Sequence, residues 1–510
     1  MRDGVVLSAF RYHAEDGKKH PVILERTPYG KNGELQGFAM DGFDVVCEDV
    51  RGRGESQGEW RPMLHERKDG YDTIEWIARQ DWCDGKVGMA GASYLGYVQW
   101  AAAAERPPHL ACIVPRVSPP DPYQNLPYEN GCFLLPVSLW YSQIVGKDSP
   151  ADASASDPYR TWPVIDADVA ARGVKNDIFR LWVKMENPED WKDAETVQDG
   201  ANAGIPSLSI SGWADGDQIG TELRWRAGRL KDRWLIYGPW AHTMVARKQL
   251  GDRTIQLGDA PNLGEIEHAF LNRFLKGDEK ALGDSPHVQA FILGADRWYR
   301  GDQWPPPSMA VRTFLDGNGE LSKALGEGER SYVADPDHVR STRPLEADPN
   351  NDTSPFWLEA EDLPYGSLVY HGAKLDQDQI VCGPFTANLV FRVDTPDVDL
   401  FAQPMDEAPD GRLLPLGQGG RARARKMLKL DRLQSGAEYT LEFPCWETLA
   451  KVPAGHRVSL MISSDRFPVY AVNSNSAAPM ATATKRLKAT VRISAKSSFT
   501  YSICDASVGR

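Results

Sequence analysis

The stretch Gly91-Ala92-Ser93-Tyr94-Leu95-Gly96 constrains the fold more than any other part of this sequence. A short apolar run ends at Gly91, and a helical run follows at once from residue 94 to residue 105. Ser93 is therefore predicted to stand at a sharp strand-to-helix turn, with its hydroxyl exposed above unpaired N–H groups that can face an oxyanion. The pattern departs from G-x-S-x-G, because Leu95 stands where the second glycine is expected. A serine that only caps a packed helix is the alternative interpretation.

Strand-like and helix-like segments alternate on both sides of this turn. The predicted strands are short apolar or β-rich runs at 5–12, 21–27, 43–49, 87–90, 111–117, 205–211, 234–237 and 287–293. The predicted helices are at 66–80, 94–105, 218–230 and 262–275, where apolar residues recur with a helical period. Strands that alternate with helices indicate a parallel sheet covered on both faces.

Two changes in composition divide the chain. After Ser118-Pro119-Pro120 the strand signals stop, and aromatic residues on helix-like segments continue to about residue 203. After Trp304-Pro305-Pro306-Pro307, short alternating runs are separated by Gly, Pro and Asp, which is typical of an all-β sandwich or jelly roll. We predict an α/β core at 1–118 and 205–304, an inserted helical cap at 119–204, and a C-terminal jelly-roll β-sandwich at 305–510.

An activated serine needs a base, and the base needs an orienting acid. On an α/β sheet these partners come from loops at the carboxyl ends of later strands, in the order Ser, Asp or Glu, His. One predicted strand runs into Gly212-Trp213-Ala214-Asp215, and the next runs into Gly238-Pro239-Trp240-Ala241-His242. Ser93, Asp215 and His242 are therefore the predicted catalytic residues.

Several other residues compete for these roles. Asp217 is the alternative acid, two residues after Asp215. Ser56 lies in Gly54-Glu55-Ser56-Gln57-Gly58, which matches G-x-S-x-G in full, but Pro62 and the missing apolar period argue against a helix directly after it. Five other histidines do not follow strands of the predicted sheet and are interpreted as surface or core residues: His65, His109, His268, His287 and His371.

An oxyanion hole needs hydrogen-bond donors as well. The backbone N–H of Tyr94 is one candidate, because it follows the nucleophile directly. The loop Arg26-Thr27-Pro28-Tyr29-Gly30-Lys31 follows an early strand and could supply a second donor, either a backbone N–H or the Tyr29 phenol. A buried structural role for Tyr29 is the alternative.

Composition excludes some classes of function. A net charge of -13 argues against a nucleic-acid partner, because phosphate contacts need basic surfaces. The N-terminus lacks the apolar region of a signal peptide, and no apolar run approaches the ~20 residues of a membrane span. Seven scattered cysteines without a C-x-x-C pair indicate free thiols in a reducing cytoplasm. No clustered His and Asp ligand set suggests a metal, and we expect no cofactor.

These residues resemble the cocaine esterase-like (CocE/NonD) serine hydrolases, which are grouped with X-Pro dipeptidyl-peptidases and α-amino-acid ester hydrolases. Besides the segments around Ser93, Asp215 and His242, the matching stretches are 26–31, 48–56 and, more loosely, 420–423. The resemblance implies an α/β-hydrolase core, a helical cap and a C-terminal jelly roll. It also implies Ser93 as nucleophile, His242 as base and Asp215 as acid, with the Tyr29 hydroxyl and Tyr94 N–H as the oxyanion hole. In this family the departure from G-x-S-x-G is expected.

We therefore expect a serine esterase that cleaves a small-molecule carboxylic ester through an acyl-enzyme on Ser93. An amidase, acylase or dipeptidyl-peptidase would use the same triad, although the chain is shorter than the peptidase members. A carbohydrate-binding role through the jelly roll is the weaker alternative. The aromatic cap suggests an apolar or aromatic acyl or alcohol group, unless those residues only pack the cap onto the core. Homo-oligomer formation is left open.

Overall fold

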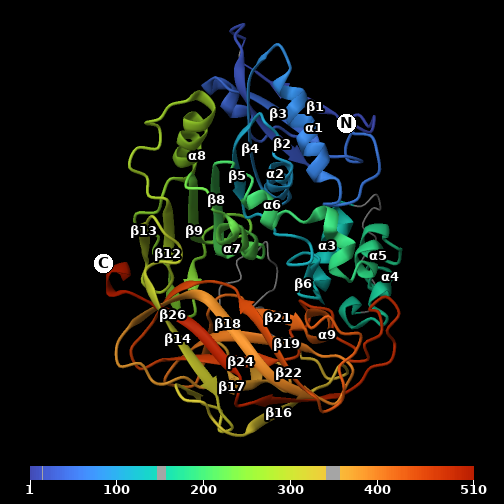
Figure 1. Ribbon diagram of the computed structural model, residues 1–510, viewed down its shortest axis with the longest axis vertical. Coiled ribbons are helices and arrows are strands. Elements are labelled where there is room, and N and C mark those ends of the chain that lie inside the picture. The colour runs from blue at the N-terminus through green and yellow to red at the C-terminus, as the bar shows by residue number, and fades with distance from the viewer. Residues whose placement is uncertain (14, 146–156, 341–356, 510) are drawn as a thin grey trace.

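The structure is a computed structural model that describes residues 1–13, 15–145, 157–340 and 357–509 (Figure 1). A nine-stranded sheet forms the first domain, in the order β1-β3-β2-β4-β5-β8-β9-β12-β13. Pairing is parallel from β3 through β12 and antiparallel only at the two edge strands, β1 and β13. The strands are β1 (Ala9–Tyr12), β2 (His20–Thr27), β3 (Asp44–Asp49), β4 (Cys83–Ala92), β5 (Leu110–Arg116), β8 (Ser207–Ala214), β9 (Arg233–Ala241), β12 (Val288–Ile292) and β13 (Arg297–Gly301).

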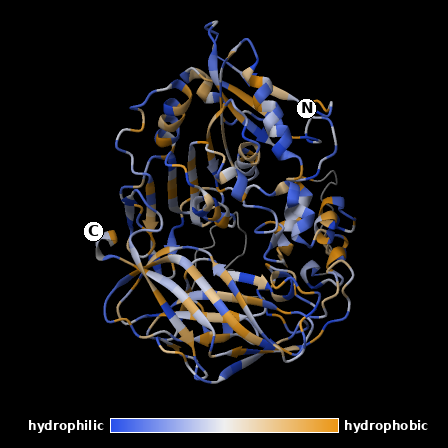
Figure 2. Ribbon diagram, viewed as in Figure 1, coloured by the Kyte–Doolittle hydropathy of each residue, from blue (hydrophilic) through white to orange (hydrophobic). Residues whose placement is uncertain are grey.

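Helices cover both faces of this sheet, because its strands are apolar on both sides. Along β2, Val22 and Leu24 pack into one core cluster and Ile23 packs into another. The first cluster includes residues of α1 (Glu66–Ala78) and α2 (Tyr94–Ala104), and the second includes residues of α8 (Leu263–Leu271). Helix α2 is buried along its whole length, whereas α1 is largely hydrophilic on its outer side (Figure 2).

The segment between β5 and β8 carries helices α3 (Leu135–Ile144), α4 (Ala167–Arg172), α5 (Asp177–Lys184) and α6 (Val197–Ala201). It also contains a short antiparallel hairpin of β6 (Tyr128–Glu129) and β7 (Cys132–Phe133). The expectation that strands are absent from this segment is therefore wrong at the hairpin, where Asn130 and Gly131 both have positive φ and close a two-residue turn. Two-residue strands are too short to leave a period in the sequence.

The C-terminal part of the chain folds into two sheets that face each other across a common core, which includes Phe391, Leu400 and Leu460. The larger sheet contains β14 (Ser308–Leu315), β15 (Leu321–Ser322), β16 (Glu329–Ala334), β18 (Gln379–Val393), β22 (Glu438–Cys445), β23 (Leu449–Val452), β25 (Ala489–Ser494) and β26 (Ser498–Cys504). The smaller sheet contains β17 (Leu368–Tyr370), β19 (Asp399–Glu407), β20 (Leu413–Pro415), β21 (Gly420–Arg423) and β24 (Arg457–Ser463). We call this part the β domain.

The β domain lies against the carboxyl-terminal edge of the first sheet (Figure 1). The backbone N–H of Leu293, just after β12, donates to the Leu449 carbonyl at 2.9 Å, and Lys451 N–H donates back to Leu293 at 2.8 Å. Trp213, Trp304 and Leu416 belong to the same continuous core cluster, so the two domains share a hydrophobic interior. All seven cysteines are buried and free. Within the described ranges, no helix is both long and apolar enough to cross a membrane.

Candidate active site

Ser93 occupies the turn between β4 and α2 in a strained conformation, with φ 59° and ψ -124°. Two glycines make this turn possible. A Cβ at Gly91, where φ is 146°, would lie 2.6 Å from the Leu95 Cβ, and a Cβ at Gly96 would lie 2.8 Å from the Ser118 Cβ. The Ser93 side chain does not cap helix α2. Its hydroxyl is turned away from the helix, which rules out the interpretation of Ser93 as a simple helix cap.

His242 and Asp215 meet Ser93 at the carboxyl edge of the sheet. Each of the three residues comes directly after its strand, because β4 ends at Ala92, β8 at Ala214 and β9 at Ala241. The His242 Nε2 lies 2.9 Å from the Ser93 Oγ, and the His242 Nδ1 lies 2.8 Å from Asp215 Oδ1. Both distances are those of hydrogen bonds, so the arrangement can move a proton from the serine to the imidazole.

Asp215 is completely buried, and its carboxylate is held from two further sides. The Ser211 hydroxyl donates to Oδ2 at 2.9 Å, and the backbone N–H of Asp217 donates to Oδ1 at 3.0 Å. These donors fix the position of the carboxylate. Asp215 is therefore oriented before a substrate arrives.

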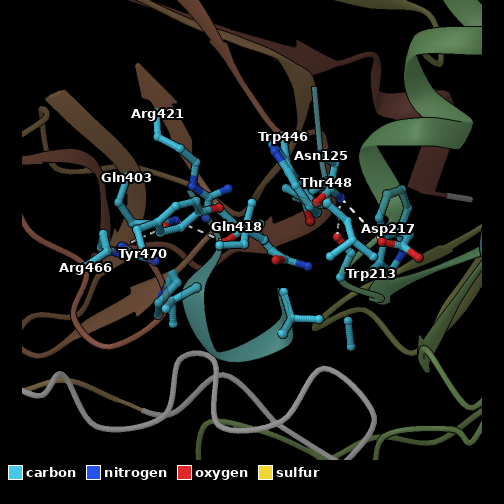
Figure 3. Close-up of a pocket in the computed structure, with 18 of the residues that line it drawn as sticks. Asn125, Trp213, Asp217, Gln403, Gln418, Arg421, Trp446, Thr448, Arg466 and Tyr470 are labelled. Atoms are coloured by element: carbon cyan, nitrogen blue, oxygen red, sulfur yellow. Dashed lines mark hydrogen bonds between the residues drawn. The ribbon is translucent and has the colours of Figure 1, made fainter. Parts of the chain in front are cut away.

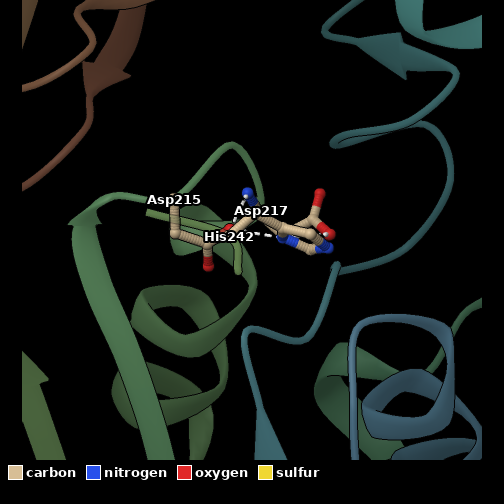
Figure 4. A group of neighbouring side chains, drawn as sticks. All are labelled: Asp215, Asp217 and His242. Carbon is tan, nitrogen blue, oxygen red and sulfur yellow. Dashed lines mark hydrogen bonds and ion pairs between the residues drawn. The ribbon is translucent and has the colours of Figure 1, made fainter. Parts of the chain in front are cut away.

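Asp217 is the weaker partner of the imidazole. Its Oδ2 lies 3.7 Å from His242 Nδ1, beyond hydrogen-bonding distance (Figure 4). Burial and the neighbouring Asp215 charge raise the pKa of Asp217 to about 7, although the His242 charge opposes the rise. The geometry favours Asp215 as the orienting acid and leaves Asp217 as a second carboxylate beside the same ring.

The two carboxylates govern the charge of His242. Burial by itself lowers the pKa of the imidazole, but the hydrogen bond and charge of Asp215 and the charge of Asp217 outweigh it and raise the pKa to about 9. A catalytic base must be neutral before it accepts a proton. The fraction of free enzyme in which His242 is neutral and can act as a base therefore increases as the pH rises.

The two predicted oxyanion donors lie in different elements of the first domain, one at the start of a helix and one in a loop. Tyr94 is the first residue of α2, where backbone N–H groups have no intrahelical acceptor. Its phenol is buried, accepts from the Met63 N–H and donates to Glu66 Oε1, both at 2.8 Å, so only its backbone remains for an oxyanion. This phenol anchors the start of the helix.

Tyr29 lies in the loop after β2. Although 46% of the Tyr29 surface is exposed, the loss of water around its hydroxyl and the charge of Asp217 raise the pKa of Tyr29 to about 12, against the effect of hydrogen bonding to Tyr141 and Ser93. The phenol is therefore protonated near neutrality and can donate. The loop is fixed by Arg53, which donates to the Pro28 carbonyl at 2.7 Å and to the Val145 carbonyl at 2.6 Å.

The competing residues are used elsewhere. The Ser56 hydroxyl donates to the Asp49 carbonyl at 2.6 Å and accepts from the Ser8 N–H at 2.8 Å, so it closes a loop. Four of the five other histidines have polar contacts away from Ser93: His109 with Glu75, His268 with Asn272, His287 with the Arg233 carbonyl, and His371 with Glu407. His65 precedes helix α1.

A cavity of about 420 Å³ lies between the first domain, the helical segment and the β domain (Figure 3). Trp213 and Asp217 line it from the first domain, and Trp140 from helix α3. The β domain contributes polar groups, among them Gln403, Gln418, Arg421, Thr448, Arg466 and Tyr470. The cavity thus joins an apolar wall to a polar one. Ser93, Asp215 and His242 do not line it, but Asp217 does, and its carboxylate lies 3.7 Å from His242 Nδ1.

Most aromatic residues of the helical segment do not reach this cavity. Tyr141 stacks on Trp182 with ring centroids 5.6 Å apart, and Phe133 packs edge-on against Phe179 at 5.9 Å. These rings are buried and hold the segment together. Trp140 differs, because 44% of its surface is exposed and it lines the cavity.

Among the described residues, one group of side chains could hold a metal ion. It consists of Asp215, Asp217 and His242, whose possible ligand atoms lie within 4.8 Å of one another. In this arrangement, however, His242 uses Nδ1 for Asp215 and Nε2 for Ser93. A metal would have to displace one of these hydrogen bonds. We therefore interpret the group as part of a proton-transfer site.

Comparison with known proteins identifies the family. The profile described as X-Pro dipeptidyl-peptidase (S15 family) matches residues 3–244, and the profile of the X-Pro dipeptidyl-peptidase C-terminal non-catalytic domain matches residues 280–498. A cocaine esterase from Rhodococcus sp. (strain MB1 Bresler) is 30% identical, and the match covers 93% of this chain and 91% of that protein. The chain belongs to the CocE/NonD family. This CocE/NonD protein is a serine hydrolase, as predicted.

Solved structures show the same fold for this CocE/NonD hydrolase. An α-amino-acid ester hydrolase superposes with a TM-score of 0.83 at 22% identity, over 99% of this chain and 95% of that chain. A CocE/NonD family hydrolase from Staphylococcus aureus superposes with a TM-score of 0.72 at 16% identity, over 99% of this chain and 92% of that chain. The match extends through the β domain, which corresponds to a C-terminal domain rich in strands.

The contribution of the β domain to the site of this CocE/NonD hydrolase has no strong signal in the sequence. Gln418 and Thr448 line the cavity more than 170 residues after His242. No local pattern marks them, because their role depends on how two domains dock. The sequence offers two hints: the family-like stretch at 420–423, whose Arg421 lines the cavity, and the glycine-rich run Gly417-Gln418-Gly419-Gly420, which resembles any other turn.

Proposed function

We propose that this CocE/NonD hydrolase cleaves a carboxylic ester of a small molecule, with Ser93 as nucleophile, His242 as general base and Asp215 as the orienting acid. The observation that carries the proposal is the continuous chain of hydrogen bonds: 2.9 Å from Ser93 Oγ to His242 Nε2, and 2.8 Å from His242 Nδ1 to Asp215 Oδ1. No cofactor takes part in this chemistry.

In the proposed reaction, His242 takes the Ser93 proton while Oγ attacks the ester carbonyl. The carbonyl oxygen becomes an oxyanion that accepts hydrogen bonds from the Tyr94 N–H and the Tyr29 hydroxyl. Collapse of the tetrahedral intermediate breaks the bond to the alcohol, which leaves with the proton held by His242. Water then hydrolyses the acyl-enzyme with the same base, and Ser93 regains its proton.

We further propose that the first domain is an α/β-hydrolase core, that residues 119–204 act as a cap, and that the β domain is a jelly roll. Trp140, Pro136 and Val137 line the cavity from helix α3, which supports an apolar or aromatic group in the substrate. The net charge of -13 supports a small molecule over a nucleic acid as partner. A cytoplasmic location stays a prediction from the free cysteines, and homo-oligomer formation stays open.

A second candidate is amide or dipeptide cleavage by the same triad. The family profile of X-Pro dipeptidyl-peptidases supports it, as does the carboxylate of Asp217 on the cavity wall, which could accept a substrate ammonium group. A panel of p-nitrophenyl esters, aminoacyl-anilides and β-lactam amides separates the two. We expect the highest kcat/KM on esters, and a preference for aminoacyl-anilides would favour the second candidate.

Substitution of the nucleophile tests the proposal directly. Ser93→Ala should abolish turnover of p-nitrophenyl esters, and the wild-type enzyme should show a burst of nitrophenol as the acyl-enzyme accumulates. Ser56→Ala is the matched control and should keep activity, because its hydroxyl only closes the loop at Asp49. Activity that survives in Ser93→Ala but not in Ser56→Ala would overturn the assignment.

A further inference from the structure

A residue of the β domain touches the proposed acid of the triad. Gln418, between β20 and β21, donates through Nε2 to the backbone carbonyl of Asp215 at 2.7 Å. Within the first domain, Ser211 and the Asp217 N–H support the carboxylate of Asp215, and the Gln218 N–H donates to its carbonyl at 3.2 Å. The loop that carries Asp215 is therefore held from both domains. Gln418 is also one of the residues that line the cavity (Figure 3).

The helix that follows Asp215 also contacts the β domain through hydrogen bonds. Helix α7 (Gln218–Ala227) begins three residues after Asp215 and carries Gln218, Glu222 and Arg226 at intervals of four, so these side chains share one face. All three contact Glu447, which lies between β22 and β23 of the β domain.

These contacts use the backbone and the side chain of Glu447. Gln218 Nε2 donates to the Glu447 carbonyl at 2.7 Å, and the Glu447 N–H donates to Glu222 Oε2 at 2.9 Å. Arg226 Nε donates to the Glu447 carboxylate at 2.9 Å, and Trp304 Nε1 donates to its other oxygen at 2.6 Å. Every polar group of Glu447 thus has a partner in or next to the first domain.

The burial of these groups makes the contact demanding. Glu447 is fully buried and Glu222 is 1% exposed, and both carboxylates depend on the guanidinium of Arg226. Buried charges are tolerated only while their partners stay in place. The two domains therefore cannot shift far against each other without leaving these groups unpaired. The β domain therefore fixes the start of α7 and, with it, the loop at 215–217.

We propose that Gln418 and Glu447 are positioning residues that let the β domain set the orientation of Asp215 toward His242. The inference rests on the proposed triad and goes beyond it, because the matching C-terminal profile describes this domain as non-catalytic. The physical reason is that the 2.8 Å hydrogen bond between Asp215 and His242 depends on the backbone of residue 215. A small shift of that backbone would lengthen the bond without touching the substrate.

Gln418→Met tests the proposal, because methionine keeps the length of the side chain and removes its donor. One lost hydrogen bond of ordinary strength corresponds to about a tenfold fall in kcat if it acts in the transition state. We expect that fall with KM changed less than about twofold. We also expect the acid limb of the kcat/KM profile to move to lower pH, because His242 loses part of its interaction with Asp215. Gln434→Met, at an exposed glutamine of the same domain, is the matched control and should change nothing.

A merely structural role predicts a different set of results. If Gln418→Met lowers the melting temperature while kcat per folded molecule and the acid limb stay at wild-type values, the inference is wrong. Glu447→Gln gives a second test, because it keeps one acceptor oxygen that can still serve Trp304 and removes the charge opposite Arg226. It should lower kcat in the same direction as Gln418→Met, and wild-type kcat in the folded variant would also contradict the proposal.

One readout does not depend on turnover. The proton between His242 Nδ1 and Asp215 should give a low-field proton resonance in the wild-type enzyme at low pH, where the imidazole is charged. We expect Gln418→Met to move this resonance upfield, and an unchanged resonance would overturn the positioning role. If Ser93→Ala keeps its esterase activity, the proposed function fails, but the resonance still reports whether the β domain orients Asp215.

Discussion

Replacing each of the two carboxylates beside His242 by its amide should affect different kinetic quantities: the pH dependence of kcat/KM for Asp217, and kcat itself for Asp215. Asp217→Asn removes a charge 3.7 Å from Nδ1 and leaves the hydrogen bond of Asp215 in place. The interaction of two charges at this distance is about 1 kcal/mol in water and about 4 kcal/mol at an effective dielectric constant of 20. These energies correspond to about 1 to 3 pH units in the pKa of His242.

The acid limb lies near the His242 pKa of about 9, where Asp217, with a pKa of about 7, is ionised and exerts its charge effect. We expect the acid limb of kcat/KM to move down by about 1 to 3 pH units in Asp217→Asn. The maximal kcat should stay within a few-fold of the wild type. Asp215→Asn should instead lower kcat by about 10⁴-fold, as the loss of an orienting acid does in serine proteases.

The assay is the pH dependence of p-nitrophenyl ester hydrolysis between about pH 5 and 10, a range that spans the pKa values of about 7 for Asp217 and about 9 for His242. Asp302→Asn, at an exposed carboxylate after β13, controls for the general effect of removing a negative charge. If Asp217→Asn abolishes turnover while Asp215→Asn keeps it, the two carboxylates have been assigned the wrong way round. An acid limb that moves upward in Asp217→Asn would refute the electrostatic reasoning itself.

Three further predictions concern the same site. Tyr29→Phe should lower kcat by about 10²–10³-fold with little change in KM, and steady-state kinetics in which only KM changes would reduce Tyr29 to a binding residue. Gly96→Ala should lower the melting temperature measured by calorimetry, because its Cβ would lie 2.8 Å from Ser118 Cβ and 3.0 Å from the Arg116 carbonyl. An unchanged melting temperature would show that the backbone at the end of β5 can move to make room for the new Cβ. The raised pKa of His242 should stabilise the fold below its unfolded value of about 6.5, and this contribution should disappear as the pH rises through about 9. Thermal unfolding at several pH values should show this loss in the wild type and a smaller one in Asp215→Asn, and equal losses in both proteins would contradict the assignment.

The parts of the site that follow single strands could be predicted from the sequence. Ser93, Asp215 and His242 each come directly after a buried apolar strand, and parallel strands bring their carboxyl ends to one edge of a sheet. The strand boundaries were less accurate: β8 and β9 run on to Ala214 and Ala241, through Gly212 and Gly238, where the sequence suggests that the strands have ended.

The parts that depend on docking could not be predicted. Gln418 and Glu447 lie in turns of the β domain, and their contacts with Asp215 and helix α7 arise only when the two domains pack. The aromatic residues of the inserted segment show the same limit. Their composition does not distinguish Trp140, which lines the cavity, from Trp182, which is buried in the segment. Periodicity reports which residues are apolar, and the fold decides which of them remain open to a ligand.

The most direct test of the account is to label the nucleophile with a fluorophosphonate probe and locate the adduct by mass spectrometry. The tryptic peptide of residues 87–116 contains Ser93, and Ser56 lies on a different peptide. We predict one adduct, on Ser93, whose formation slows at low pH as His242 becomes protonated and disappears in Ser93→Ala. An adduct on Ser56, or labelling that persists unchanged in Ser93→Ala, would contradict the claim that the turn after β4 carries the nucleophile.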